Sequence, residues 1–132
     1  MGMTKTGKAA VGGMVVADVA TTPLFDAIAI GTDATAFAST QTKLLAEITT
    51  NGGARRSAAN VTGSLVTTTD LNDTAQWVTV FTFTGTLGVN EYMVGNNAAA
   101  DTGVMLLRGV FVSTLNVVDG DTLTLTLKVK FA

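Results

Sequence analysis

The segment 116–132, NVVDGDTLTLTLKVKFA, alternates apolar and polar side chains more regularly than any other part of the chain. Because successive strand side chains point to opposite faces of a sheet, this period of two predicts a strand with one buried and one exposed face. The Asp-Gly-Asp before it predicts a turn, so we interpret the strand as the second arm of a hairpin. We expect it to be paired, since a long free edge invites aggregation. Its buried set is Leu123, Leu125, Leu127, Val129 and Phe131, and its exposed set is Thr122, Thr124, Thr126, Lys128 and Lys130.

The chain is poor in charge. Of its 132 residues, 47% are hydrophobic, but only 14% are charged and 6% aromatic, so much of the surface must consist of Thr, Ser, Asn and Gly. Charged residues normally keep a freely diffusing protein soluble, and we interpret their scarcity as typical of an assembly member that neighbours partly cover. The net charge of −2, with no basic cluster larger than Arg55-Arg56, argues against nucleic acid as a partner.

The chain contains no cysteine and no histidine. This excludes Cys-based zinc sites, thiol nucleophiles, disulfides and Ser-His-Asp catalysis, and we expect no cofactor. No apolar run approaches the roughly 20 residues of a membrane helix, so no membrane partner is expected. Paired carboxylates can hydrolyse glycosides without histidine, but the acids available lie in or beside predicted turns without an aromatic-lined cleft. We therefore expect no enzyme; the acids in question are Asp70, Asp73, Glu91 and Asp101.

The chain divides near its only proline, Pro23. Residues 1–22 carry little pattern and are expected to form a flexible, extended arm, whereas residues 23–132 are expected to form a single β-rich domain. Strand-like segments alternate with turn residues at the spacing of an antiparallel sandwich. We predict a mainly β fold, a small antiparallel β-sandwich or jelly-roll-like barrel with one helix near the N-terminus. Besides the segment described first, the predicted strands span residues 24–30, 60–69, 75–84, 90–96 and 104–112.

Residues 33–50 are predicted to form that helix. Phe37, Leu44, Leu45 and Ile48 recur at helical spacing and define one apolar face. Thr32 or Asp33 is a suitable N-cap, and Asn51-Gly52-Gly53 supplies the positive φ angles that favour a helix end. Lys43 and Glu47 are expected to form a pair on the exposed side.

The sequence GGARRS, directly after the predicted helix, allows two interpretations. Arg55 and Arg56 form either a corner that pairs bidentately with carboxylates of a neighbour, or solvated charges after a helix stop. The aspartates of DLND and DGD offer oxygens of the kind calcium prefers, but turn chemistry explains them without a metal. Trp77 lies in an aromatic strand and is interpreted as core rather than as a sugar platform. The possible subunit or capsid contacts are Arg55, Arg56, Thr122, Thr124, Thr126, Lys128 and Lys130.

Several motifs resemble those of a family of small tailed-bacteriophage virion proteins. They are GGARR after a helix, a Thr-rich strand, NDTA before an aromatic strand, LLRGVF, and VVDGDTLTLTLKVKF, and together they span about residues 38–132. Members of this family are commonly labelled tail-fibre or decoration components. The resemblance implies a structural role on the surface of a phage particle.

The leading hypothesis is a capsid decoration or cement protein, a homotrimer seated where capsomers meet and bound to the major capsid protein. The resemblance, the charge-poor surface and the small β-rich domain motivate it. One alternative is a tail-fibre or head-fibre module that binds host-surface glycan, with NNAAADTG as a polar binding loop. The other is a head-to-tail connector or tail component.

Overall fold

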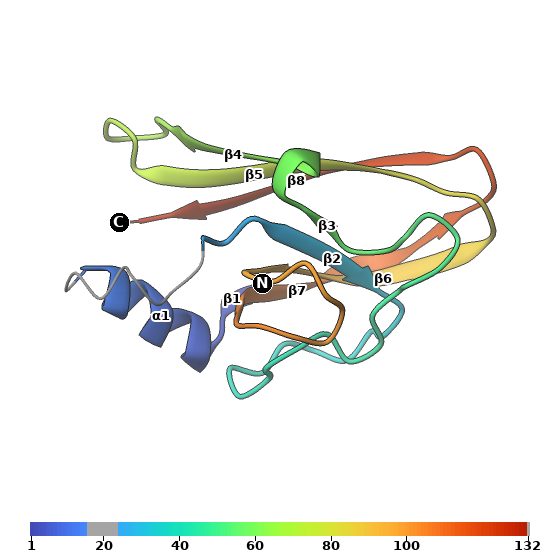
Figure 1. Cartoon of the computed structure of the whole chain (residues 1–132), viewed down its shortest axis with the longest axis horizontal. Helices are drawn as coiled ribbons and strands as arrows, with labels where there is room; N and C mark the ends of the chain where they lie inside the picture. The colour runs from blue at the N-terminus through green and yellow to red at the C-terminus, as the bar shows by residue number, and fades with distance from the viewer. Residues whose placement is uncertain (16–23, 132) are drawn as a thin grey trace.

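Two antiparallel β-sheets packed face to face make up most of the structure (Figure 1). The computed structural model describes residues 1–15 and 24–131. Sheet A contains β1 (Gly2–Met3), β2 (Ala27–Gly31), β3 (Arg56–Ser57), β6 (Leu87–Gly95) and β7 (Met105–Val117), in the order β1-β7-β6-β2-β3. Sheet B contains β4 (Val61–Val66), β5 (Thr74–Thr82) and β8 (Thr122–Lys130), in that order. The prediction of a mainly β sandwich is confirmed.

The hydrophobic core lies between the two sheets and draws on both. Since complete burial of one large apolar side chain contributes roughly 1.5–3 kcal/mol, this shared core holds the sheets together. The prediction that β8 turns its leucines inward is confirmed, because Leu125 and Leu127 are 6% and 5% exposed. Phe131, predicted to be buried with them, lies beyond the end of β8 and is 50% exposed, so that part of the prediction was wrong. Other members of the core include Ile28, Ile30, Phe81, Phe83, Val89, Val94 and Leu107.

β8 does not form a hairpin with β7. It pairs with β5 along its whole length, from Thr82 opposite Thr122 to Thr74 opposite Lys130, whereas β7 pairs with β6 in sheet A. The predicted turn is present, with Gly120 at a φ of +89°, but it carries the chain from one sheet to the other. The hairpin prediction was wrong because a turn sequence sets a local change of direction and does not choose the partner strand.

Residues 33–50 form no helix. Instead they make an irregular segment that returns to β2, where the Thr32 amide donates to the Ala46 carbonyl and the Ile48 amide donates to the Ile30 carbonyl, both at 2.9 Å. Leu44 packs there with Ala29, Met93 and Met105. Because Ala29 alternates with the core residues Ile28 and Ile30, this packing lies on the outer face of sheet A.

Tertiary hydrogen bonds replace the helical ones in this segment. The amides of Leu45 and Ala46 donate to the carboxylate of Glu91, and the carbonyl of Thr35 accepts from Arg108. These groups are then unavailable for a helical ladder. The helix prediction was therefore wrong. The apolar spacing correctly marked Leu44 and Ile48 as buried, but Leu45, which it also placed on the apolar face, is 46% exposed.

The α-helix of the described chain is α1 (Lys5–Val15), within the predicted arm, and a short 3-10 helix, η1 (Ala58–Asn60), precedes β4. Thr4 is fully buried, and its Oγ1 accepts a hydrogen bond of 2.9 Å from the Gly7 amide, which is N-cap geometry. The Thr4 amide donates to the Leu106 carbonyl at 3.0 Å, and β1 pairs with β7 beside it. Residues 2–15 thus form a short strand and a helix where the sequence predicted an extended arm, and residues 16–22 lie outside the described residues.

Candidate functional site

The polar side of β8 lies exposed on the outer face of sheet B, as predicted. Leu125 and Leu127 point into the core, so the alternating residues point away from it. All five of these side chains are exposed to solvent in the single chain. The structure therefore brings together five of the seven predicted contact residues, Thr122, Thr124, Thr126, Lys128 and Lys130.

The register of sheet B places further side chains beside these five. Val80 of β5 lies opposite Thr124 and is 49% exposed, and Thr62 of β4 lies opposite Val78. Sequence reasoning missed the contributions of β4 and β5, because they depend on which strands pair. We call this surface the threonine face and define it by Thr62, Ser64, Gln76, Val78, Val80, Thr82, Thr122, Thr124, Thr126, Lys128 and Lys130.

Asp73 lies at the end of the threonine face and holds the loop between β4 and β5. Its carboxylate accepts hydrogen bonds from the amides of Thr68, Thr69 and Asp70 at 2.8–3.1 Å. Burial by itself raises the pKa of Asp73, but these bonds outweigh it and hold the pKa well below the ordinary 3.8. The Lys130 ammonium is 3.7 Å from Asp73 Oδ2, so one of the two lysines on this face is neutralised within the chain.

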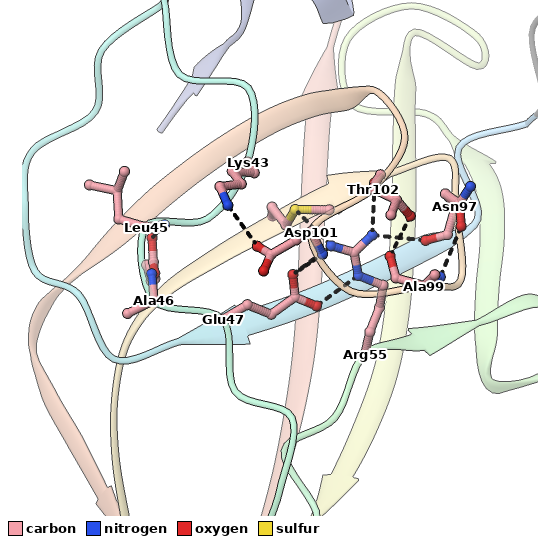
Figure 2. Close-up of polar contacts among 11 residues, drawn as sticks. Lys43, Leu45, Ala46, Glu47, Arg55, Asn97, Ala99, Asp101 and Thr102 are labelled. Atoms are coloured by element: carbon pink, nitrogen blue, oxygen red, sulfur yellow. Dashed lines mark hydrogen bonds and ion pairs between the residues drawn. The ribbon is translucent and has the colours of Figure 1, made fainter.

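Arg55 is not available to a neighbour. Its guanidinium forms a bidentate pair with the Glu47 carboxylate, with Nε to Oε1 at 2.8 Å and Nη2 to Oε2 at 2.6 Å (Figure 2). Both side chains are buried, at 3% and 2% exposure. The predicted bidentate geometry is therefore present, but its partner belongs to the same chain, and the alternative of a solvated charge is wrong as well.

The Arg55–Glu47 pair also fixes the loop formed by residues 96–104. Arg55 Nη1 donates to the carbonyls of Asn97 and Thr102, and the Asp101 amide donates to Glu47 Oε2 at 3.1 Å (Figure 2). The predicted Lys43–Glu47 pair is absent, because Lys43 instead lies 3.5 Å from Asp101. The polar NNAAADTG loop is thus held from within.

Arg56 lies apart from the threonine face. It is half-buried in β3, with its guanidinium carbon 5.6 Å from the centre of the Phe81 ring. Its Nε is buried without a hydrogen-bond partner. A cation–π contact of this kind orients the side chain toward the core. Neither predicted arginine therefore belongs to the exposed surface.

A buried ion pair that sequence reasoning missed lies on the outer face of sheet A. Glu91 and Arg108 are both fully buried, and Arg108 Nη1 also donates to Gln41 Oε1 at 3.1 Å. The available signal was one arginine inside the apolar run VMLLRGVFV and one glutamate in a neighbouring predicted strand. This pair closes the outer face of sheet A under residues 33–50, whereas the outer face of sheet B stays open.

The four acids considered for catalysis have separate partners. Asp73 interacts with Lys130, Glu91 with Arg108, and Asp101 with Lys43, while Asp70 is exposed in a turn. Among residues 1–15 and 24–131, no group of three or more potential metal-ligating side chains occurs. The Trp77 indole is 8% exposed and donates to the Phe25 carbonyl at 2.7 Å, so its interpretation as a core residue is confirmed.

Comparison with protein-family models, with curated proteins and with solved structures gave no match. Within the described parts of the chain, no helix has both the length and the apolar character needed to cross a membrane. The threonine face and the sequence motifs are therefore the features of this chain that point to a function.

Proposed function

We propose that this protein is a structural component of a tailed-phage virion, a capsid decoration or cement protein that contacts the major capsid protein through the threonine face. The observation that carries the proposal is the difference between the two outer sheet faces. Residues 33–50 cover the outer face of sheet A, whereas the outer face of sheet B is open along its three strands. The motifs that resemble virion proteins include β8, which supplies five residues of this face.

The chemistry of the threonine face suits contact with another protein. No carboxylate belongs to it, and its hydroxyls lie beside the exposed methyl groups of valine and threonine. Interface cores are typically depleted in charged residues, and hydroxyls accept or donate hydrogen bonds across them. A stable contact buries about 1,000 Å² or more, and many copies on one particle turn modest affinity per contact into strong resistance to disruption.

Host-glycan recognition, the alternative function, receives less support. Sugar platforms need exposed aromatic rings, and among the aromatic residues of the described chain only Phe131, at 50% exposure, is largely open to solvent. The NNAAADTG loop contains no ring. The connector or tail alternative differs from the decoration role mainly in the number of copies on each particle.

Binding to phage heads that lack the protein tests the proposal. Purified protein is mixed with such heads, and the bound copies are counted by quantitative mass spectrometry against the major capsid protein. We expect a copy number that scales with the number of capsomers and a gain in resistance to heat. Thr124→Glu places a carboxylate on the β8 strand of the threonine face and should abolish binding, whereas Ala98→Glu in the NNAAADTG loop should leave it intact.

Three results would contradict the proposal. A few copies per particle would indicate a connector or fibre instead. Equal binding by the two variants would mean that the threonine face is not the contact, and loss of binding by Ala98→Glu alone, together with binding of the wild type to host cells, would favour host recognition.

A further inference from the structure

β8 forms one edge of sheet B. Its hydrogen bonds to β5 determine which of its backbone amides and carbonyls point to the open edge. Beyond the two ends of the strand, the Phe83 amide donates to the Asp121 carbonyl and the Phe131 amide donates to the Asp73 carbonyl, both at 2.8 Å. In an antiparallel pair, alternate residues bond the partner strand and those between them point away. The residues that direct their amides and carbonyls to the open edge are therefore Thr122, Thr124, Thr126, Lys128 and Lys130.

This edge has few of the features that prevent strands from pairing. Proteins protect edges with proline, bulges, very short strands, lysines on the edge strand or charges that point inward. β8 contains no proline or glycine, and its register with β5 runs without a shift from Thr122 to Lys130. Its two lysines point to the outer face, and the charge of Lys130 is balanced by Asp73.

We propose that β8 pairs with β8 of a second copy of this chain, antiparallel about a two-fold axis at Thr126. In this register Thr122 lies opposite Lys130 and Thr124 opposite Lys128 on the outer side. Every cross-strand pair then joins chemically compatible residues, and no lysine faces a lysine. On the inner side, Leu123 lies opposite Val129 and Leu125 opposite Leu127.

The neighbouring registers are less favourable. An axis at Leu125 or Leu127 also sets outward amides opposite outward amides, but it leaves two residues of each β8 without a partner in the other strand. An axis at Lys128 sets two lysines directly opposite each other, which is destabilising. An axis at Thr124 moves Lys128 and Lys130 past the end of the partner strand, opposite Gly120 and Val118, so the ladder shortens. The Thr126 register alone uses the full strand.

Pairing in this way joins two copies of sheet B into one continuous sheet. It covers Leu123 and Val129, which are half-buried in the single chain, and it sets the two threonine faces side by side. The contact is isologous, as two-fold contacts are. The proposed strand pairing does not depend on the proposed function. It predicts a dimer, whereas the resemblance led us to expect a trimer.

Cysteine cross-linking of the otherwise unchanged full chain tests both the partner and the register. The chain has no cysteine, so Thr126→Cys introduces a single thiol, which the proposed axis places opposite its own copy within disulfide range. We expect a covalent dimer under mild oxidation. Thr122→Cys is the matched control on the same strand, because its two copies would lie roughly 25 Å apart and should not cross-link.

Sedimentation equilibrium supplies a measurement that needs no cross-link. The wild-type protein should sediment as a dimer, and Thr126→Pro, which removes the outward amide at the axis, should raise its dissociation constant at least tenfold. Gly63→Pro, at an outward-facing position of the opposite edge strand β4, should leave it unchanged. A wild-type monomer or trimer, or cross-linking of Thr122→Cys without that of Thr126→Cys, would overturn the proposal.

Discussion

Arg108 and Glu91 lie on the adjacent strands β7 and β6, where Nε and Nη2 of the arginine are each 2.7 Å from Oε2 of the glutamate and neither side chain is exposed. The pair links sheet A to residues 33–50, because Glu91 accepts from two amides of that segment and Arg108 donates to one of its carbonyls. Two strands and their irregular cover thus share one buried charge centre.

Arg108→Met should be strongly destabilising. Removal of one partner leaves the Glu91 carboxylate buried without a counter-charge, which typically costs about 3–5 kcal/mol of unfolding free energy. Lys43→Met is the control, since the Lys43–Asp101 pair is about half exposed and such pairs contribute at most about 1 kcal/mol. Urea unfolding of both variants measures the difference, and similar losses for the two would refute this role.

Gly31→Ala should disturb the same centre from the backbone side. A Cβ at Gly31 would collide with Glu91 Oε1 and come within 2.6 Å of the Ala46 carbonyl oxygen. We expect a loss of about 1–3 kcal/mol in stability. At Gly63 a Cβ meets only Trp77 Cδ1, at an ordinary 3.9 Å, so Gly63→Ala should not destabilise. Thermal unfolding that ranked the two variants in the opposite order would contradict this geometry.

Arg55→Lys should loosen the loop of residues 96–104. Lysine keeps the charge but cannot form the bidentate pair with Glu47 while bonding the carbonyls of Asn97 and Thr102. We expect a loss of about 1–3 kcal/mol in the free energy of unfolding. Hydrogen exchange should also become faster at the Asp101 amide, which donates a hydrogen bond to Glu47. Exchange rates in β8 serve as the internal control. Unchanged exchange at Asp101 would show that the loop holds its conformation without this arginine.

The stability contributed by Asp73 should depend on pH. Its folded-state pKa lies below the unfolded value of 3.8, so its contribution is complete above that value and is lost as pH falls below it toward the folded pKa. Asp73→Asn should therefore be less stable than the wild type at pH 7. The gap in unfolding free energy between the two proteins should narrow below pH 3.8. Urea unfolding at a series of pH values measures the gap, and a constant gap would contradict the assignment.

The strands were predictable because their signal is local. Alternation along β8 is a property of neighbouring residues, and so is the exposure of Thr124 on one side and the burial of Leu125 on the other. The identity of the partner strand is not local. The DGD turn is compatible with a hairpin or with a passage between sheets, and only the packing of both sheets decides between them.

The segment 33–50 shows the same limit from another direction. Its apolar spacing correctly marked Leu44 as buried, but two side chains far away in the sequence, Glu91 and Arg108, occupy the backbone groups that a helix would use. A bidentate pair between Arg55 and a carboxylate of a neighbour was one of two interpretations of its sequence context. That the carboxylate is Glu47 of the same chain depends on how the two loops fold over sheet A.

The chain passes from one sheet to the other between β3 and β4, between β5 and β6, and between β7 and β8. Neither sheet is therefore a continuous stretch of sequence, and β5 gains its second neighbour only when β8 arrives. Contacts so distant along the chain make for slow folding, because loop closure precedes the gain from pairing. Until that step, one side of β5 is an unpaired edge, and the partly folded chain is most exposed to aggregation there.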